Sequence, residues 1–200
     1  IAVVGASANP TKIGHAALKN ILISDYQCKL YPINPDDDEI LGLKCYKKLN
    51  DVPGPIDLVL ISVPSPLVAQ IVKECVAKKV KHIIIITSGF SEIGNHDGEE
   101  EIKKIVEGTG IRILGPNTMG YKNASDGIDC SFVFGVPRKG NLALISQSGA
   151  LGVGMIYLAN NEFVGLSKIV GMGNKLDIDD DDLIDYFSKD PDTKVIGLYI

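Results

Sequence analysis

The hydrophobic positions along the chain fall into short runs of valine, isoleucine and leucine, and segments with helical periodicity separate these runs. Continuous apolar runs of this length are typical of parallel strands whose two faces are both covered by helices. Five runs predict strands in the first part of the chain: Ile1–Val4, Lys29–Ile33, Leu58–Val63, His82–Ile86 and Arg112–Leu114. The alternation of strands and helices predicts a doubly wound α/β fold, with Ile83–Ile86 in a central strand.

Apolar residues three and four positions apart predict the helices between these strands. Ile13, Ala17 and Ile21 share one face of the first predicted helix. The second predicted helix has Ser65 as its expected N-cap and Pro66 in its first turn. Its apolar positions are Leu67, Val68, Ile71, Val72, Cys75 and Val76. A third, more charged helix is expected over residues 99–107.

The periodicity weakens after Gly120, where turn residues accumulate, so residues 122–140 are expected to form a linker after a first domain of residues 1–121. A second α/β series is expected over residues 141–200. Its predicted elements are the strands Leu142–Ser146, Leu166–Val170 and Lys194–Ile200 and the helices Ala150–Asn160 and Asp181–Phe187. Three strands are few for a sheet, and both ends of the chain look cut, so we expect an incomplete second domain of a longer protein.

Composition narrows the classes of function. The formal net charge of −5 and the isoelectric point near 5.2 argue against a general nucleic-acid or membrane-surface binder, because such partners select basic surfaces. No apolar stretch approaches the roughly 20 residues that cross a bilayer, and no signal segment is evident, so a cytoplasmic protein is expected. The four cysteines are widely spaced, which predicts reduced thiols and neither a zinc site nor a disulfide framework.

The loop after the first predicted strand is rich in small residues and opens a helix, and the free amides of a helix N-terminus form a natural anion site. Its glycines, Gly5 and Gly14, lack the tight G-x-G-x-x-G spacing of dinucleotide-binding proteins. Lys12 and the hydroxyls of Ser7 and Thr11 are candidate phosphate donors. An ordinary strand-to-helix turn explains the same residues equally well.

After the second predicted strand stands Asn34, where a dinucleotide enzyme usually presents a carboxylate to the ribose. An amide tolerates a nearby ribose phosphate that a carboxylate would repel, and coenzyme A carries such a 3′-phosphate. Asn34 precedes a proline, so a simple turn remains the alternative.

Three further strand ends place small and hydroxyl-bearing residues at the carboxyl edge of the predicted sheet, where ligands of open α/β sheets bind. Residues 62–66 and 87–91 contain Val63, Pro64 and Phe90, which suit a pantetheine arm or an adenine face, beside Ser88 and Gly89. The third such edge is residues 115–120. Caps and turns explain the same residue types.

The segment from Ser146 to Gly152 follows a strand and opens a helix, so Ser148 and the amides of Gly149 and Ala150 point where an anion could rest. Ser146 replaces the first glycine of a G-x-S-x-G nucleophile motif, and no histidine or acid partner is apparent. A helix cap is the competing and commoner interpretation of Ser148.

The remaining candidate groups do not predict a metal site. His15, His82 and His96 lack a second ligand at helical spacing, and only His15 lies near the first loop. The acidic residues from Asp177 to Asp182 precede a predicted helix, and carboxylates there stabilise the helix dipole. They also lack the spacing of an EF-hand loop.

Six motifs, in order along the whole chain, resemble those of the ADP-forming (nucleotide-diphosphate-forming) acetyl-CoA and acyl-CoA synthetases, with the succinyl-CoA synthetase α subunit as a more distant relative. They are Val4–Ser7, Tyr31–Pro35, Ser88–Glu92, Gly115–Asn117, Ile145–Gly152 and Gly173–Lys175. The resemblance implies a Rossmann-like coenzyme A-binding domain followed by the first part of a flavodoxin-like CoA-ligase domain.

The resemblance also implies the site residues. Those for coenzyme A are Gly5, Ser7, Lys12, Ile13, Gly14, Asn34, Val63, Pro64, Ser88, Gly89, Phe90 and Asn117. Those for the phosphate of a phosphohistidine are Ser146, Ser148, Gly149 and Ala150. In this family acyl-CoA and phosphate give acyl phosphate, which phosphorylates a histidine, and that histidine then phosphorylates ADP.

The phosphorylated histidine is expected beyond Ile200, so the chain itself is expected to bind coenzyme A without turnover. Mg-ADP or Mg-ATP is expected on an ATP-grasp module, either fused or a separate β subunit, and the assembly is expected to be an oligomer. Thr118 stands where relatives often have cysteine or serine. Two alternatives remain: a coenzyme A-sensing module or protein acyltransferase part, and an NAD-linked oxidoreductase, which the Gly5-to-Gly14 spacing and Asn34 disfavour.

Overall fold

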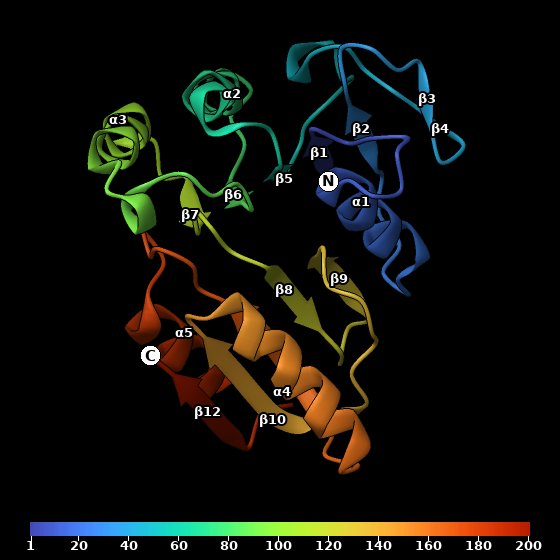
Figure 1. Ribbon diagram of the computed structural model, residues 1–200, viewed down its shortest axis with the longest axis vertical. Helices are drawn as coiled ribbons and strands as arrows, with labels where there is room; N and C mark the ends of the chain where they lie inside the picture. Colours follow the sequence, from blue (N-terminus) through green and yellow to red (C-terminus); the bar gives the residue numbers. More distant parts are fainter.

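The computed structural model describes residues 1–200 as two five-stranded sheets with helices around them (Figure 1). The first sheet is entirely parallel and has the strand order β2-β1-β5-β6-β7. Its strands are β1 (Ala2–Val4), β2 (Tyr31–Ile33), β5 (Leu58–Ile61), β6 (His82–Ile85) and β7 (Arg112–Leu114). The predicted doubly wound fold is therefore confirmed, although β5, and not the isoleucine-rich β6, is the central strand.

Both faces of the first sheet are buried, as its unbroken apolar runs require. The helices α2 (Ser65–Ala77) and α3 (His96–Val106) pack on one face and share an apolar core with it. On the opposite face lie α1 (Ile13–Ile23) and the second sheet, which form a second core with the first sheet. The first sheet thus lies between α2 and α3 on one side and α1 and the second sheet on the other.

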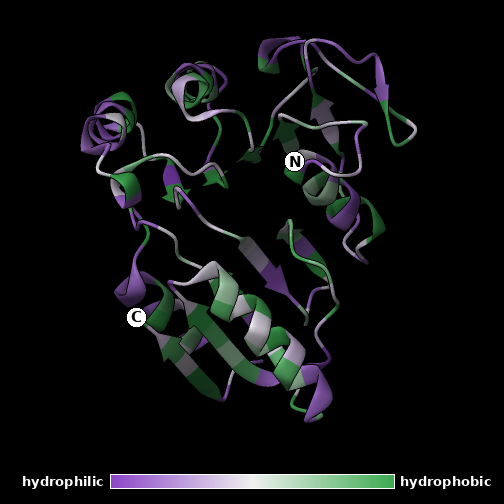
Figure 2. Ribbon diagram, in the orientation of Figure 1, coloured by the Kyte–Doolittle hydropathy of each residue, from purple (hydrophilic) through white to green (hydrophobic).

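The second sheet is mixed and has the order β12-β10-β11-β8-β9. Its strands are β8 (Gly120–Asn123), β9 (Ile128–Ser131), β10 (Lys139–Ser146), β11 (Leu166–Gly171) and β12 (Val195–Tyr199). The last three are parallel, whereas β8 and β9 form an antiparallel hairpin beside β11. The helices α4 (Gly149–Asn161) and α5 (Asp180–Lys189) accompany this sheet, and Figure 2 shows its strands β10 and β12 as largely apolar.

The segment expected to be a linker, residues 122–140, is therefore not irregular throughout, because it contains the second half of β8, all of β9 and the start of β10. Polar residues at buried strand positions hide the pattern. The side chain of Lys122 is only 3% exposed, and its ammonium group donates to Asp129 at 2.5 Å and to the Val133 carbonyl at 2.8 Å. The hairpin also contacts α1, where the Asn20 amide donates to the Ser131 carbonyl at 2.9 Å.

Several helix ends differ from the sequence-based expectation. Ser65 is the first residue of α2 and not its cap, since Pro64 occupies the N-cap position without a side-chain hydrogen bond. Ile13 is 47% exposed, so the buried face of α1 does not include it. The charged helix α3 begins earlier than expected, because the Asn95 side chain accepts from the Gly98 amide and caps it.

The remaining elements of the fold are short. A two-stranded hairpin of β3 (Glu39–Ile40) and β4 (Leu43–Lys44) and two short 3-10 helices, η1 (Leu49–Asp51) and η2 (Ser91–Ile93), were not expected from the sequence. All four cysteines are free thiols, of which only Cys28 is exposed. No helix is both long and apolar enough to span a membrane.

Candidate functional site

The loop after β1 is forced into its course by two glycines. Gly5 has a φ of +87°, and a Cβ atom there would lie 2.8 Å from the Ser62 carbonyl oxygen. A Cβ atom at Gly14 would lie 1.9 Å from the Gly5 carbonyl oxygen. The first turn of α1 therefore packs directly on the end of β1, which only glycine permits. This contact places the N-terminus of α1 at the carboxyl edge of the first sheet.

The side chains of this loop mostly bond to the loop itself. The backbone amide of Asn9 donates to the Ser7 hydroxyl at 3.1 Å, and the Thr11 hydroxyl donates to the Asn9 side-chain oxygen at 2.8 Å. His15 lies at the same place, with Nδ1 2.9 Å from the Ser7 carbonyl oxygen. Lys12 is exposed, has no such partner and occupies the N-cap position of α1. Among the predicted phosphate donors of the loop, it is the uncommitted one.

Asn34 lies beside this loop, but its side chain already has partners. Its amide donates to the Ala6 carbonyl at 2.7 Å, and its side-chain oxygen accepts from the Asp36 amide at 2.8 Å. Asn34 therefore ties the end of β2 to the loop after β1. The structure brings this predicted residue to the expected edge and gives it a positioning contact there.

The loop after β6 is also at the carboxyl edge, and a carboxylate holds it. Glu92 accepts from the Gly89 amide at 2.5 Å and from the Phe90 amide at 3.1 Å. Asn95 donates to the Gly89 carbonyl at 2.9 Å. Ser88 is exposed at the tip of the loop. Glu92 belongs to a quoted motif, but no role was assigned to it from the sequence.

The expected contact of Phe90 with a ligand arm is wrong for its side chain. Phe90 is 2% exposed and belongs to the core between the first sheet and α2 and α3. An aromatic ring in a turn between apolar elements is drawn into the core because its burial outweighs the turn preference. Val63 is partly exposed and Pro64 is exposed, so the apolar surface of this edge comes from these two residues.

The segment from Gly115 to Gly120 connects the two predicted sites. Asn117 is exposed at the carboxyl edge of the first sheet. Two residues later, Met119 is buried against α4, where a Cβ atom at Gly152 would lie 2.8 Å from the Met119 Cε. The Thr118 hydroxyl between them donates to the Gly171 carbonyl at 2.5 Å. A single short segment therefore runs from the edge of the first sheet to the start of α4.

Both serines at the start of α4 already form hydrogen bonds within the protein. Ser148 is the N-cap, and its hydroxyl accepts from the Leu151 amide at 3.3 Å, so the capping interpretation is confirmed. Ser146 is fully buried and donates to the Ser148 carbonyl at 2.8 Å. Gly149 and Ala150 form the first helical positions, where backbone amides lack partners within the helix. A phosphate here would meet mainly these amides.

The loop after β11 reaches from the second sheet to the edge of the first. The backbone amide of Asn174 in this loop donates to the Pro116 carbonyl at 2.9 Å, and the backbone amide of Leu176 donates to the Gly115 carbonyl at 2.9 Å. Gly173 has a φ of +63°, and a Cβ atom there would lie 2.1 Å from the Pro116 carbonyl oxygen. The sequence identifies the motif Gly173–Lys175 of this loop, but it does not indicate which residues the motif contacts.

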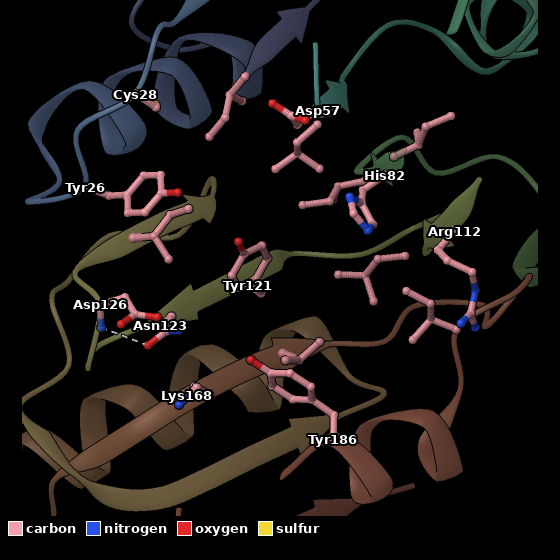
Figure 3. Close-up of a pocket in the computed structure, with 18 of the residues that line it drawn as sticks. Tyr26, Cys28, Asp57, His82, Arg112, Tyr121, Asn123, Asp126, Lys168 and Tyr186 are labelled. Carbon is pink, nitrogen blue, oxygen red and sulfur yellow. Dashed lines mark hydrogen bonds between the residues drawn. The ribbon is translucent and has the colours of Figure 1, made fainter. Parts of the chain in front are cut away.

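A cavity of about 850 Å³ lies elsewhere, between the two sheets at the amino ends of β5, β6 and β7. Figure 3 shows Asp57 and His82 on one side of it and Tyr121, Lys168 and Tyr186 on the other. None of the residues predicted to bind coenzyme A or phosphate lines it. Of the two lysines that line it, Lys29 and Lys168, Lys168 is paired with Asp190 at 2.5 Å.

The acidic run has a structural role. Asp179 is the N-cap of α5 and accepts from the Asp181 amide at 3.1 Å, which confirms the predicted capping. Arg112 pairs with Asp182 at 2.8 Å and with Asp177 at 3.0 Å. Side-chain oxygens of Asp179, Asp181 and Asp182 lie within 4.8 Å of one another, and the cap and the ion pair account for those of Asp179 and Asp182.

A parallel α/β sheet that presents glycine-rich turns and a helix N-terminus at its carboxyl edge defines a nucleotide-binding class of domain. Residues 1–124 match the model of the CoA-binding domain family, and residues 139–200 match that of the succinyl-CoA ligase like flavodoxin domain. The chain belongs to the CoA-binding domain family.

Several characterised proteins are similar over the whole chain. An ADP-forming acetate–CoA ligase of Methanocaldococcus jannaschii is 45% identical, and the chain covers 28% of it. The α subunit of ADP-forming acetate–CoA ligase II of Pyrococcus furiosus is 43% identical, with 44% covered. The solved dinucleotide-forming acetyl-coenzyme A synthetase 1 of Candidatus Korarchaeum cryptofilum, in complex with phosphate and ADP, is 46% identical with a TM-score of 0.95, and 43% of that chain is covered. The chain thus spans less than half the length of these relatives.

Proposed function

We propose that the chain is the coenzyme A-binding and phosphate-binding part of an ADP-forming acyl-CoA synthetase. The observation that supports this function best is the segment Gly115–Gly120, which joins the carboxyl edge of the first sheet to the start of α4. In this proposal the thioester and the phosphoryl group are held at the two ends of this one short segment. Relatives that are acetate–CoA ligases over the same residues support the same reaction.

In this proposal the first unit, residues 1–121, holds coenzyme A. Lys12 and the amides of the first turn of α1 bind its phosphates, because a helix N-terminus and an ammonium group both favour anions. Val63 and Pro64 contact the pantetheine arm, the tip residues Ser88 and Gly89 border it, and Asn117 faces the thioester end. The glycines Gly5 and Gly14, with Ile13 and Asn34, shape and hold the loop.

The second unit, residues 141–200, binds the phosphoryl group. Phosphate attacks the thioester carbonyl, coenzyme A leaves as the thiol, and an acyl phosphate forms. A histidine beyond the chain takes the phosphoryl group and releases the carboxylic acid, and ADP then takes it to give ATP. The amides of Gly149 and Ala150, with Ser146 and Ser148 shaping the turn, stabilise the phosphohistidine charge.

The remaining partners are part of the same proposal. Mg-ADP would bind an ATP-grasp module outside this chain, either fused or as a separate subunit in an oligomer. A cytoplasmic location fits the reduced thiols.

Isothermal titration of the 200-residue chain with coenzyme A tests the proposal. We expect one site, and we expect Lys12→Ala to weaken binding about tenfold, because it removes a charge-assisted contact to phosphate. The matched control is Lys103→Ala, which removes another exposed lysine, on α3. Absence of coenzyme A binding, or tight binding of NAD instead, would overturn the assignment.

A further inference from the structure

The loop Ser88–Glu92 is fixed by residues from both units of the molecule. Within the first unit, Glu92 accepts from the Gly89 and Phe90 amides, and Glu99 accepts from the Ser91 amide at 3.1 Å. From the second unit, the Asn174 side-chain nitrogen donates to Glu92 at 2.5 Å and to Glu99 at 2.8 Å. One amide group therefore bridges the two carboxylates that hold the loop.

Both polar atoms of the Asn174 side chain are hydrogen-bonded at this place. Its two N–H groups point to two different carboxylates, and its side-chain oxygen accepts from the Asn117 amide at 3.3 Å. An asparagine offers two donors on its nitrogen, so the pair of carboxylates fixes which way the amide faces. An aspartate in its place would put a third negative charge against Glu92 and Glu99.

Glu92 connects the amide to the loop. One of its oxygens accepts from Gly89, and the other accepts from both Phe90 and Asn174. Withdrawal from water raises the pKa of the Glu92 carboxyl, but these donors, Asn174 foremost, outweigh it, and the pKa lies below its ordinary value. The carboxylate is thus charged when it holds the loop, and the contact to Asn174 is a charge-assisted hydrogen bond.

Asn174 also contacts the segment Gly115–Gly120, which contains Asn117. Its backbone amide donates to Pro116, next to Asn117, and Gly173 before it allows no side chain against that segment. The position of Asn174 therefore depends on how the second unit docks, and the conformation of two coenzyme A-edge loops depends on Asn174.

We propose that Asn174 is a positioning residue that couples coenzyme A binding in the first unit to the docking of the phosphate-binding unit. The inference rests on the proposed function, since it assumes that the loops of Gly89 and Asn117 border coenzyme A. Coupling of this kind is reciprocal: coenzyme A strengthens the docking by the factor by which docking strengthens coenzyme A binding.

Titration of the 200-residue chain with coenzyme A at neutral pH tests the coupling. We expect Asn174→Asp to weaken binding about tenfold, within the usual range of coupling between sites. The double variant Asn174→Asp with Glu99→Gln should recover to within about threefold of wild type, because the glutamine removes one repelling charge, can donate to the new carboxylate and keeps an oxygen for the Ser91 amide. The matched control is Asn141→Asp, which adds the same charge at an exposed position of β10.

The rescue separates positioning from mere damage, because a misfolded variant would not regain affinity through a second substitution. Wild-type affinity in Asn174→Asp, weakening without recovery in the double variant, or an equal effect of Asn141→Asp each overturns the coupling while leaving the proposed function intact. Failure of the wild-type chain to bind coenzyme A overturns the proposed function instead, and the inference with it.

Discussion

At the scale of single residues, the side chains that hold the molecule together are often polar ones in buried places. Lys168 on β11 is 5% exposed, and its ammonium group lies 2.5 Å from the Asp190 carboxylate, which is 8% exposed. Thr193 donates to the same carboxylate at 2.5 Å. A buried charge is tolerated only when it is paired and hydrogen-bonded, so this pair fixes the turn between α5 and β12.

The pair predicts a pH-dependent stability. Loss of hydration raises the pKa of Asp190, but the hydrogen bonds from Lys168 and Thr193 lower the pKa by more than this. The pKa of Asp190 therefore lies below its ordinary value of 3.8. Because the folded-state pKa is depressed, the stabilisation is present above pH 3.8 and is lost as the pH falls through the lower folded-state value. We expect Asp190→Asn to lower the free energy of unfolding by about 3 kcal/mol at pH 7, since it leaves the buried Lys168 with only the more distant, half-exposed Asp192 as a partner, at 3.7 Å.

Urea denaturation from pH 7 down to pH 3 measures this effect. The difference between wild type and Asp190→Asn should shrink below pH 3.8. Asp57→Asn is the control, because its pair with Lys81 is 3.4 Å long and both side chains are more than two-thirds exposed, so little change is expected. A difference that persists unchanged to pH 3 would show that the charge of Asp190 is not its cause.

At the scale of elements, helix starts carry both structure and proposed chemistry. Ser148 caps α4, and the same N-terminus is the proposed phosphate site. Ser148→Asp should keep the cap, since aspartate is as good an N-cap as serine, yet it places a negative charge where phosphate would bind. We expect unchanged urea stability to within about 0.5 kcal/mol and a clearly weaker response to inorganic phosphate.

Thermal shift with increasing inorganic phosphate measures that response, and Ser148→Ala serves as the comparison. The alanine should cost about 1 kcal/mol of stability through loss of the cap while leaving the amides of Gly149 and Ala150 free to bind. Equal phosphate responses in wild type and Ser148→Asp would remove the phosphate site from this helix.

The elements also show which parts of the fold can be predicted from the sequence. Unbroken apolar runs such as Leu58–Ile61 identify a parallel strand on their own, because only burial on both faces selects them. The strand β8 escapes this signal, since its buried Lys122 is made acceptable by Asp129 seven residues later. A pattern of hydrophobicity cannot express a pairing between charges, so the hairpin was interpreted as a linker.

The candidate site, like the fold, can be predicted from the sequence only in part. The sequence locates the loops at the carboxyl edge, because glycines and hydroxyl residues after strands have a local meaning. It does not tell that Phe90 turns into the core or that Asn174 meets Glu92, since these contacts join residues that are brought together only by the fold. Loop positions are therefore predictable here, and the side chains that face a ligand are less so.

At the scale of the whole molecule, the two units share a hydrophobic core. Leu60 and Ile84 of the first sheet belong to the same buried cluster as Ala143 and Ile145 of the second. Interfaces between independent domains are usually more polar than this. The hydrogen bonds of Asn174 lie at the edge of that shared core, so the units are held by burial and aligned by polar contacts.

Because the core is shared, we expect the two units to unfold together. Ile145 is fully buried in β10, and Ile145→Ala should lower the free energy of unfolding by about 3 kcal/mol through lost burial and a cavity. Hydrogen exchange then measures how far the loss spreads: the protection of β6 in the first sheet should fall as much as that of β10, because amides in one cooperative unit exchange through the same opening. The reciprocal variant is Ile102→Ala on the outer helix α3, which should lower the protection of β10 as well. If each substitution weakens protection only in its own sheet, the two units open separately, and the shared core does not make them one cooperative unit.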